Sequence, residues 1–335
     1  MTTRHAFLPA ARARRQSGAA LLAAMLTVML VATFSAAALW QQWRASEVEG
    51  AERARVQAAW VLIGALDWSR LILGEDGRAG GPDHLGEPWA VPLEEARLTS
   101  FLSADKNVSS DNLEGLPDAF LSGRIVDAQS KLNVLSLVDG GKPVPASVAT
   151  FTRLFNLLGL PVSELNRMTT GLVSALATST DTASSGGDGG AAPLMPLEVS
   201  QLVWLGLSPS TATALEPYVT VLPVRTTLNL NTASAEAMSA SMESLSIANA
   251  RQLVERRTRS FFKTVDDANA GLPSGGSRFN ATQHGVGTQY FEVQGRLRLD
   301  RTWVEEHSLV QRNGITVTTL WRTRGAGATT TPAKP

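Results

Sequence analysis

The longest apolar stretch of the chain lies close to its N-terminus. Residues 19–43, AALLAAMLTVMLVATFSAAALWQQW, contain no charged side chain. An α-helix rises about 1.5 Å per residue, so this stretch reaches roughly 37 Å and exceeds the hydrocarbon core of a bilayer, which is about 30 Å thick. It is also longer than the 7–15 apolar residues of a secretory signal. The pattern therefore predicts one membrane-spanning helix that carries a folded body.

The helical pattern continues past the apolar stretch. Between residues 44 and 73, apolar side chains recur at spacings of three, four, seven or eight residues, as on one face of a helix. These positions are Val48, Val56, Trp60, Ile63, Leu66 and Leu73. We expect one long helix whose second half packs this stripe against the body, and a Gly-, Asp- and Pro-rich loop at residues 74–88 that ends it.

The body is predicted to begin and end with strands. Within residues 122–138, Ile125 and Val126 indicate a strand that runs into a turn. From residue 290 to residue 322 apolar and polar positions alternate, and Asn313 with Gly314 forms a strong hairpin signal. Residues 324–335, rich in Gly, Ala, Thr and Pro, are expected to be disordered.

Helices are predicted between these strands. The apolar positions of residues 148–222 follow a helical period, and Ser163 is the expected N-cap of one of the helices. The expected helices cover residues 151–160, 163–178, 195–209 and 211–223. A Gly- and Ser-rich loop at residues 181–193 interrupts them. The fold class is therefore α+β, with a block of helices inserted into a smaller sheet.

Composition restricts the chemistry. Lys plus Arg and Asp plus Glu both number 30, so no overall charge attracts a nucleic acid, while four arginines before the apolar stretch favour a cytoplasmic N-terminus. The chain has no cysteine, and its four histidines show no HExxH pairing, which argues against thiol chemistry and a catalytic zinc. No GxSxG motif is present. We expect no enzyme. Trp40 and Trp43 suit the membrane interface.

The N-terminus resembles a type IV pilin or pseudopilin. A basic leader, RRQSG, ends at Gly18 directly before the apolar stretch. In that family a prepilin peptidase cuts after this glycine, so the resemblance implies cleavage between Gly18 and Ala19. Most members carry glutamate at the fifth mature position, which here is Ala23. In lacking this glutamate, the chain resembles the general secretion pathway protein K family. Its members are the large minor pseudopilins at the tip of the type II secretion pseudopilus.

Two further segments resemble this family, and together they imply a domain layout. Residues 122–138 resemble the family's strand that runs into an Asn-containing link. Residues 205–209 resemble the segment that separates two of its helices. The implied insertion is all-helical, of the helix-hairpin-helix or SAM-like kind. The layout is a leader at 1–18, a transmembrane half-helix at 19–43, a pilin-like α+β domain at 44–139 and 286–324, an inserted helical domain at 140–285 and a tail at 325–335.

A rival interpretation rests on residues 228–270, which resemble a helix-hairpin-helix module that binds DNA backbones. Such modules use a Gly-x-Gly turn, whereas the turn here, residues 243–247, has no glycine and contains a carboxylate. Five basic residues follow, but acidic residues interleave with them. The sequence therefore favours a structural hairpin, with Asn229, Asn231, Thr232 and Ser234 as turn and N-cap residues.

The family resemblance also points to a calcium-binding site. Relatives bind calcium through an acidic loop near the helical domain, and the matching loop here offers Asp181 and Asp188. Calcium takes six to eight oxygen ligands, so these two carboxylates contribute to a site without completing it.

The resemblance implies a non-enzymatic tip subunit that initiates or caps the pseudopilus for export of folded proteins across the outer membrane. It implies a single-pass inner-membrane protein with a periplasmic body. Its expected partners are minor pseudopilins of the I, J and H types, the prepilin peptidase and the inner-membrane secretion platform, with no nucleic acid. The alternatives are a membrane-anchored DNA-binding protein and a single-pass membrane enzyme.

Overall fold

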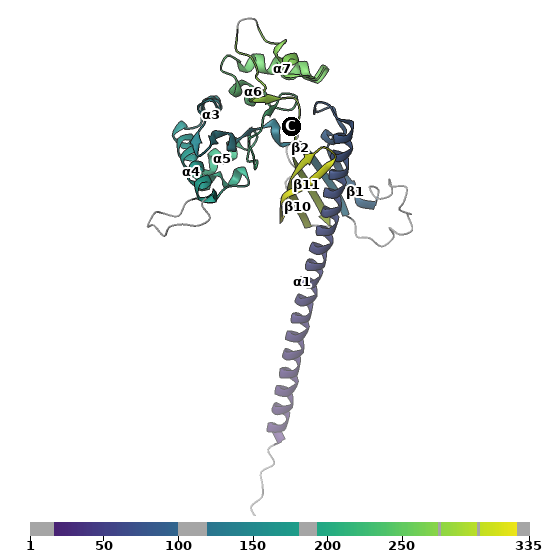
Figure 1. Ribbon diagram of the computed structural model, residues 1–335. Coiled ribbons are helices and arrows are strands. Elements are labelled where there is room, and N and C mark those ends of the chain that lie inside the picture. Colours follow the sequence, from purple (N-terminus) through teal and green to yellow (C-terminus); the bar gives the residue numbers. More distant parts are fainter. Residues whose placement is uncertain (1–16, 100–118, 181–192, 274–275, 300–301, 327–335) are drawn as a thin grey trace, which may run out of the picture. The chain divides into compact units, whose positions relative to one another are not determined.

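The computed structural model describes residues 17–99, 119–180, 193–273, 276–299 and 302–326 (Figure 1). The chain divides into two compact units, Met1–Gln57 and Ala58–Pro335. Helix α1, Ser17–Ala79, contributes to both units. The prediction of a long N-terminal helix combined with an antiparallel sheet and further helices is confirmed.

Within the second unit, α1 buries a different face from the one that the apolar pattern predicts. Its core positions are Ala58, Leu62, Leu66, Ser69 and Leu73, spaced by four or three residues. Leu66 and Leu73 belong to the predicted stripe, whereas Trp60 is 69% exposed. Val48 and Val56 of the same stripe lie in the first unit. The prediction was wrong at Trp60 because Ala58 and Ser69, which are small and carry little hydrophobic signal, are buried on this face.

Helix α1 also continues further than predicted, through Ala79, so the segment from residue 74 to residue 79 is not a loop. Gly80 and Gly81 follow with φ angles of 66° and 116°. Left-handed backbone of this kind favours glycine and commonly ends a helix. The first glycines, Gly74 and Gly77, remain helical instead and lie directly against carbonyl oxygens of Ile315 and Gly314.

The sheet has five antiparallel strands in the order β1-β2-β9-β10-β11. Their bounds are Leu93–Arg97 for β1, Ala119–Asp127 for β2, Tyr290–Leu299 for β9, Thr302–Asn313 for β10 and Thr316–Ala326 for β11. The hairpin at Asn313 and Gly314 is confirmed. Residues 324–326 belong to β11, because they pair with β10, and are not part of a disordered tail.

One core lies between α1 and the sheet. Leu66 and Leu73 pack there against Trp89, Phe291 and Val310 among others. Leu62 comes within 3.1 Å of the position that a Cβ would take at Gly295. The guanidinium of Arg70 donates two hydrogen bonds to the Val317 carbonyl, at 3.0 and 2.8 Å, and so satisfies an acceptor on the edge strand β11.

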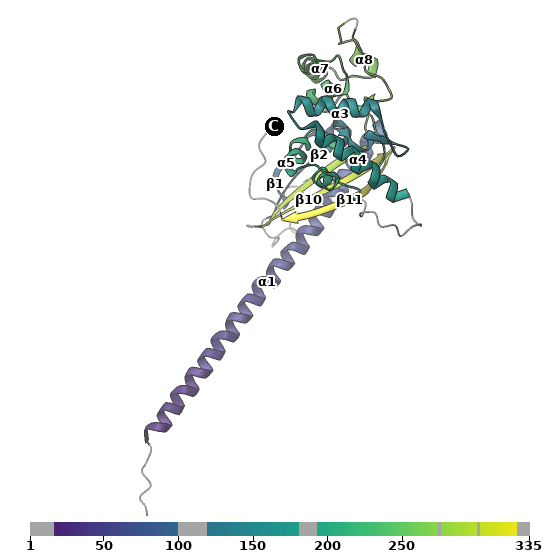
Figure 2. The same ribbon diagram turned by 90° about the vertical axis from the view of Figure 1, so that its left-hand side faces the viewer.

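The segment between β2 and β9 carries the other helices and a second, larger core (Figure 2). Its helices are α3 Pro145–Leu157, α4 Val162–Thr180, α5 Pro209–Leu215, α6 Ala235–Ser241, α7 Ile247–Arg259 and α8 Val265–Asn269. The 3₁₀ helices here and elsewhere are η1 Pro88–Ala90, η3 Ala128–Ser130, η4 Val134–Leu137 and η5 Val199–Leu205.

Short two-residue strands join these helices. They are β3 Leu132–Asn133, β4 Val138–Asp139, β5 Lys142–Pro143, β6 Val219–Thr220, β7 Leu228–Asn229 and β8 His284–Gly285. Three helix predictions need correction. The helix predicted over 195–209 is instead the shorter 3₁₀ helix η5, Val199–Leu205. Ser163 lies inside α4, which begins one residue earlier, and the helix predicted over 211–223 ends at Leu215, after which the chain pairs as β6 with β3.

Candidate functional site

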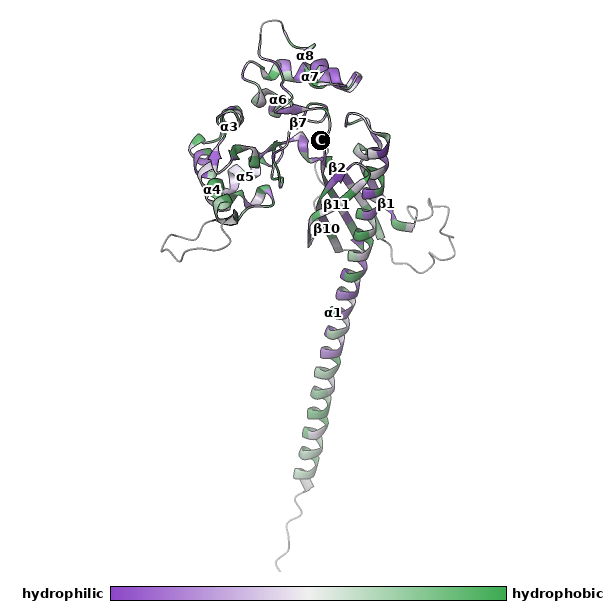
Figure 3. Cartoon of the chain, viewed as in Figure 1, coloured by the Kyte–Doolittle hydropathy of each residue, from purple (hydrophilic) through white to green (hydrophobic). Residues whose placement is uncertain are grey.

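The first unit presents the residues singled out for processing and membrane insertion. Gly18 and Ala19 lie in the first turn of α1, and Ala23 lies one turn further on, so Ala19 and Ala23 share a helix face. Trp40 and Trp43 are exposed, and their ring centroids are 5.4 Å apart. Among the described residues, one helix, Ala19–Ala79, is long and apolar enough to cross a membrane. Much of the first half of α1 is coloured green, or hydrophobic, in Figure 3.

In the second unit, α1 exposes an apolar face of its own. Trp60 and Leu71 are 69% and 66% exposed. Trp60, Gly64 and Leu71 are four and seven residues apart and lie on one side of the helix, which also carries Asp67, 59% exposed and paired with Arg70. Gly64 sits in the middle of this face, and a Cβ at that position would meet nothing within 4 Å. A small residue between two large apolar ones allows a second helix to approach closely.

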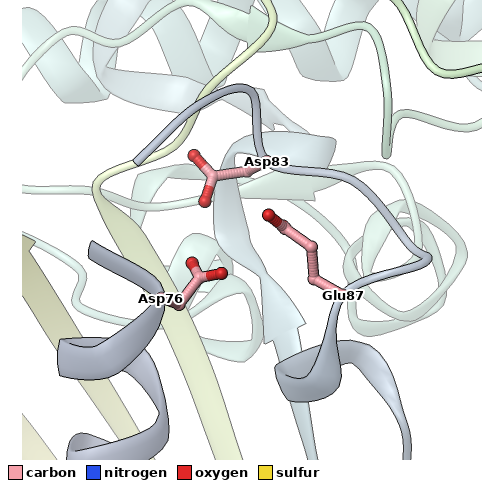
Figure 4. Close-up of side chains that lie close together, drawn as sticks. All are labelled: Asp76, Asp83 and Glu87. Carbon is pink, nitrogen blue, oxygen red and sulfur yellow. The ribbon is translucent and has the colours of Figure 1, made fainter. Parts of the chain in front are cut away.

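Three carboxylates converge where α1 ends (Figure 4). Asp76 comes from α1, and Asp83 and Glu87 come from the segment that follows it. One carboxylate oxygen from each lies within 4.8 Å of the others. Glu87 accepts hydrogen bonds from the His84 backbone N–H at 2.9 Å and from Trp89 Nε1 at 2.8 Å. Burial raises the pKa of Glu87 to about 7 and also raises the pKa of Asp83.

Arg312 of β10 neutralises part of this charge. Its guanidinium forms ion pairs with Asp76 and Asp83, and it also donates to the Thr288 carbonyl at 3.1 Å. The side chains of the two aspartates are 10% and 5% exposed, so the pairs are shielded from water. Three carboxylates suit calcium by their chemistry. Here, however, a guanidinium already occupies two of them, and the cluster joins α1 to the sheet.

A buried network joins the sheet to the helical segment. Asp127, at the end of β2, accepts hydrogen bonds from Asn229 Nδ2 at 2.9 Å, from Thr232 Oγ1 at 2.5 Å and from the Gln129 backbone N–H at 2.7 Å. Asn229 also donates to the Asp83 carbonyl at 3.1 Å. Burial raises the pKa of Asp127 to about 6. Asn229 and Thr232 are therefore structural residues, as the sequence predicted.

The helix-hairpin-helix segment shows the same structural character. Ser234 caps α6 by accepting from the Ala237 N–H at 3.1 Å, which confirms its predicted role. Asn231 exchanges two hydrogen bonds with the backbone of Phe262. Arg257, one of the basic residues that follow the turn, is buried and donates to the Leu230 carbonyl at 2.7 Å, and burial lowers its pKa to about 10. It is not available to a phosphate.

Comparison with known proteins identifies the family. A family model for "Type II secretion system (T2SS), protein K" matches residues 228–287, and a second of the same description matches residues 130–224. The type II secretion system protein K of Pseudomonas aeruginosa is 30% identical over 331 residues, which cover 92% of this chain and 90% of the relative. The chain belongs to the type II secretion system protein K family.

Another protein K, from Pectobacterium carotovorum subsp. carotovorum, is 24% identical over 345 residues, covering 95% of this chain and 99% of the relative. The structure also resembles a chain from the crystal structure of the GspK-GspI-GspJ complex of enterotoxigenic Escherichia coli. The TM-score is 0.59 and the identity is 19%, over 82% of this chain and 98% of that chain. This likeness shows that the protein K fold is shared.

Membership in the protein K family assigns this chain to the minor pseudopilins of type II secretion, as the leader and Ala23 indicated. The predicted calcium ligands Asp181 and Asp188 lie outside the described residues. The carboxylate cluster of Asp76, Asp83 and Glu87 was missed by the sequence analysis, which treated residues 74–88 only as a loop. Four acids among the glycines of that segment, three of which form the cluster, are the signal that could have drawn attention to it.

Proposed function

We propose that this protein K is a tip subunit of the type II secretion pseudopilus, anchored in the inner membrane with a periplasmic body. The exposed apolar face of α1, formed by Trp60, Gly64 and Leu71, is the observation that carries this proposal. A soluble body that leaves two large apolar side chains of one helix in water presents a surface suited to a partner. The partner helices would be those of minor pseudopilins of the I and J types.

Two further features support the tip position. The helical segment between β2 and β9 contains six α-helices among the described residues, a bulk that a subunit within a fibre shaft would have to accommodate at every repeat. Ala23 replaces the carboxylate with which other pseudopilins are thought to neutralise the N-terminal amine of a neighbour. A first subunit has no earlier amine to neutralise, so the replacement costs it nothing. No catalytic role is part of this proposal.

Replacing Trp60 by lysine is expected to weaken association with I- and J-type partners by about tenfold or more, because a buried tryptophan at an interface often contributes over 2 kcal/mol. The measurement is co-purification and titration of the full-length chain in detergent with the two partners. Leu85→Lys, an equally drastic change at a position that is 56% exposed and outside α1, is the control. If both variants bind the two partners equally well, the α1 face is not part of the interface.

Gly18→Ala is expected to leave the precursor uncleaved when prepilin peptidase is co-expressed. The family pattern has glycine directly before the scissile bond, and a Cβ at this position would obstruct the protease. Mass spectrometry of the intact chain distinguishes an N-terminus at Met1 from one at Ala19. Ser17→Ala, one residue earlier, serves as the control and should mature normally. Normal maturation of Gly18→Ala would contradict the proposed processing.

The rival DNA-binding role finds less support. In the hairpin of residues 228–270, Arg257 is buried, and Arg251 lies 4.0 Å from the Glu236 carboxylate. The hydrogen bonds of Asn229 and Asn231 are made to the protein itself. These residues hold the hairpin together.

A further inference from the structure

A cavity of about 430 Å³ lies where the two family-matched segments join. Its walls include residues 131–133 and 136, the first turns of α3, and residues 225–228, of which 225–227 link the two segments. No role follows for it from membership in the protein K family or from the proposed tip position. Its volume falls in the range of sites that bind small ligands or short peptide segments.

The cavity combines an apolar floor with a polar rim. Leu132, Phe151 and Leu228 are buried and line its floor. The polar residues of its wall include Ser136, Ser147 and four threonines. A few polar groups around an apolar base fix the orientation of a bound molecule, while the base contributes affinity. This composition suits a peptide, whose backbone needs hydrogen-bond partners and whose side chains need apolar contact.

Positive charge gathers at the rim of the same cavity. The Lys131 ammonium nitrogen lies 3.3 Å from a carboxylate oxygen of Glu292. This pair uses one of the three N–H donors of Lys131. Arg225 pairs with Asp139, but the two side chains are 45% and 65% exposed. An exposed pair of this kind contributes about 0–1 kcal/mol, so another carboxylate can replace Asp139 at little cost.

The start of α3 adds to this charge. The helix has 13 residues, its N-cap is Val144, and no side chain caps it. Pro145 has no N–H, and the Val144 N–H donates to the Leu137 carbonyl at 2.8 Å. The N–H groups of Ala146 and Ser147, which line the cavity together with Val144, lack intrahelical acceptors. The N-terminal end of a helix dipole favours an anion, as do the two cationic side chains.

We propose that this cavity binds a short, extended peptide segment through a carboxylate. Arg225, Lys131 and the first turn of α3 would hold the carboxylate, and the floor of Leu132, Phe151 and Leu228 would receive an apolar side chain two or three residues away. A free inorganic anion would occupy only a small part of the volume and leave the apolar floor uncovered.

The test is calorimetric titration of the full-length chain in detergent with acetyl-Ala-Leu-Thr-Asp-amide, which carries one carboxylate. Saturable binding is expected, at least tenfold weaker when asparagine replaces the aspartate and several-fold weaker when alanine replaces the leucine. Arg225→Gln should weaken binding at least tenfold. Arg251→Gln removes the same charge from α7 and should change affinity less than twofold. Thermal unfolding of both variants verifies that they are folded.

Three results would overturn the proposal. The aspartate and asparagine peptides could bind equally, or neither could bind at millimolar concentration. Inorganic phosphate could bind as tightly as the peptide with no effect of the leucine, which would define a free-anion site. Because the titration uses the isolated chain, it is independent of the partner-binding measurement on Trp60→Lys, and either result can fail alone.

Discussion

Arg312→Met is expected to lower the free energy of unfolding by about 3–5 kcal/mol, because it leaves two buried carboxylates without their counter-charge. Asp76 and Asp83 are shielded from water and would face each other and Glu87 after the change. Methionine keeps part of the volume of the arginine stem, so the effect reports mainly the lost charge. Urea unfolding of the full-length chain in detergent, followed by tryptophan fluorescence, measures it.

Arg78→Met is the matched control for this change. Arg78 lies near the same end of α1 and pairs with Glu75, but the side chains are 62% and 65% exposed, so its loss should cost less than about 1 kcal/mol. Adding Asp83→Asn to Arg312→Met should recover part of the stability by removing one uncompensated charge. A loss for Arg312→Met no larger than that for Arg78→Met would show that the cluster does not depend on its guanidinium.

His284 is expected to make the stability of the body fall by about 3 kcal/mol between pH 7 and pH 4. Its ring is buried, and its Nε2 lies 3.0 Å from Ser241 Oγ. The ring also makes an edge-to-face contact with Phe279. Burial lowers its pKa from 6.5 to about 4. Above pH 6.5 the ring is neutral in both states. Between pH 6.5 and pH 4 the unfolded chain binds a proton that the folded chain does not, so stability falls as pH falls.

The His284→Gln variant isolates this contribution, because glutamine does not titrate. The difference in unfolding free energy between the two proteins should change by about 3 kcal/mol in favour of the variant from pH 7 to pH 4. Asp127, whose pKa is raised to about 6, acts in the opposite direction, since its stability contribution falls as pH rises. It is present in both proteins and cancels from the difference. A difference that stays constant across this range would contradict a buried, neutral His284.

Local signals explain which parts of the structure could be predicted. The uncharged residues 19–43, the Asn313–Gly314 turn and the Ser234 cap each act through neighbours within a few residues, and the corresponding elements were predicted correctly. The buried face of α1 was predicted only in part, because the pattern weights Trp60 heavily and Ala58 lightly. The fold buries Ala58 and leaves Trp60 exposed, a choice that depends on residues distant in the chain.

The carboxylate cluster lay beyond sequence reasoning for a different reason. Asp76 and Arg312 are 236 residues apart in the chain, and no periodicity connects them. Their meeting depends on how α1 crosses the sheet, where Gly74 and Gly77 allow the helix to contact the β10–β11 turn. The same holds for Asp127 and Asn229, 102 residues apart.

The hydrogen bonds of Asp127 also dictate how protein K chains can be recombined. A chimera that takes its sheet from one relative and its helical segment from another would bring together a carboxylate and an amide that evolved apart. If the donor segment began after residue 232, Asn229 and Thr232 would come from the recipient and the buried carboxylate would keep its partners. A graft that starts at residue 228 must instead have Asn at position 229 and Thr at position 232, or Asp127 would be buried without two of its hydrogen-bond donors.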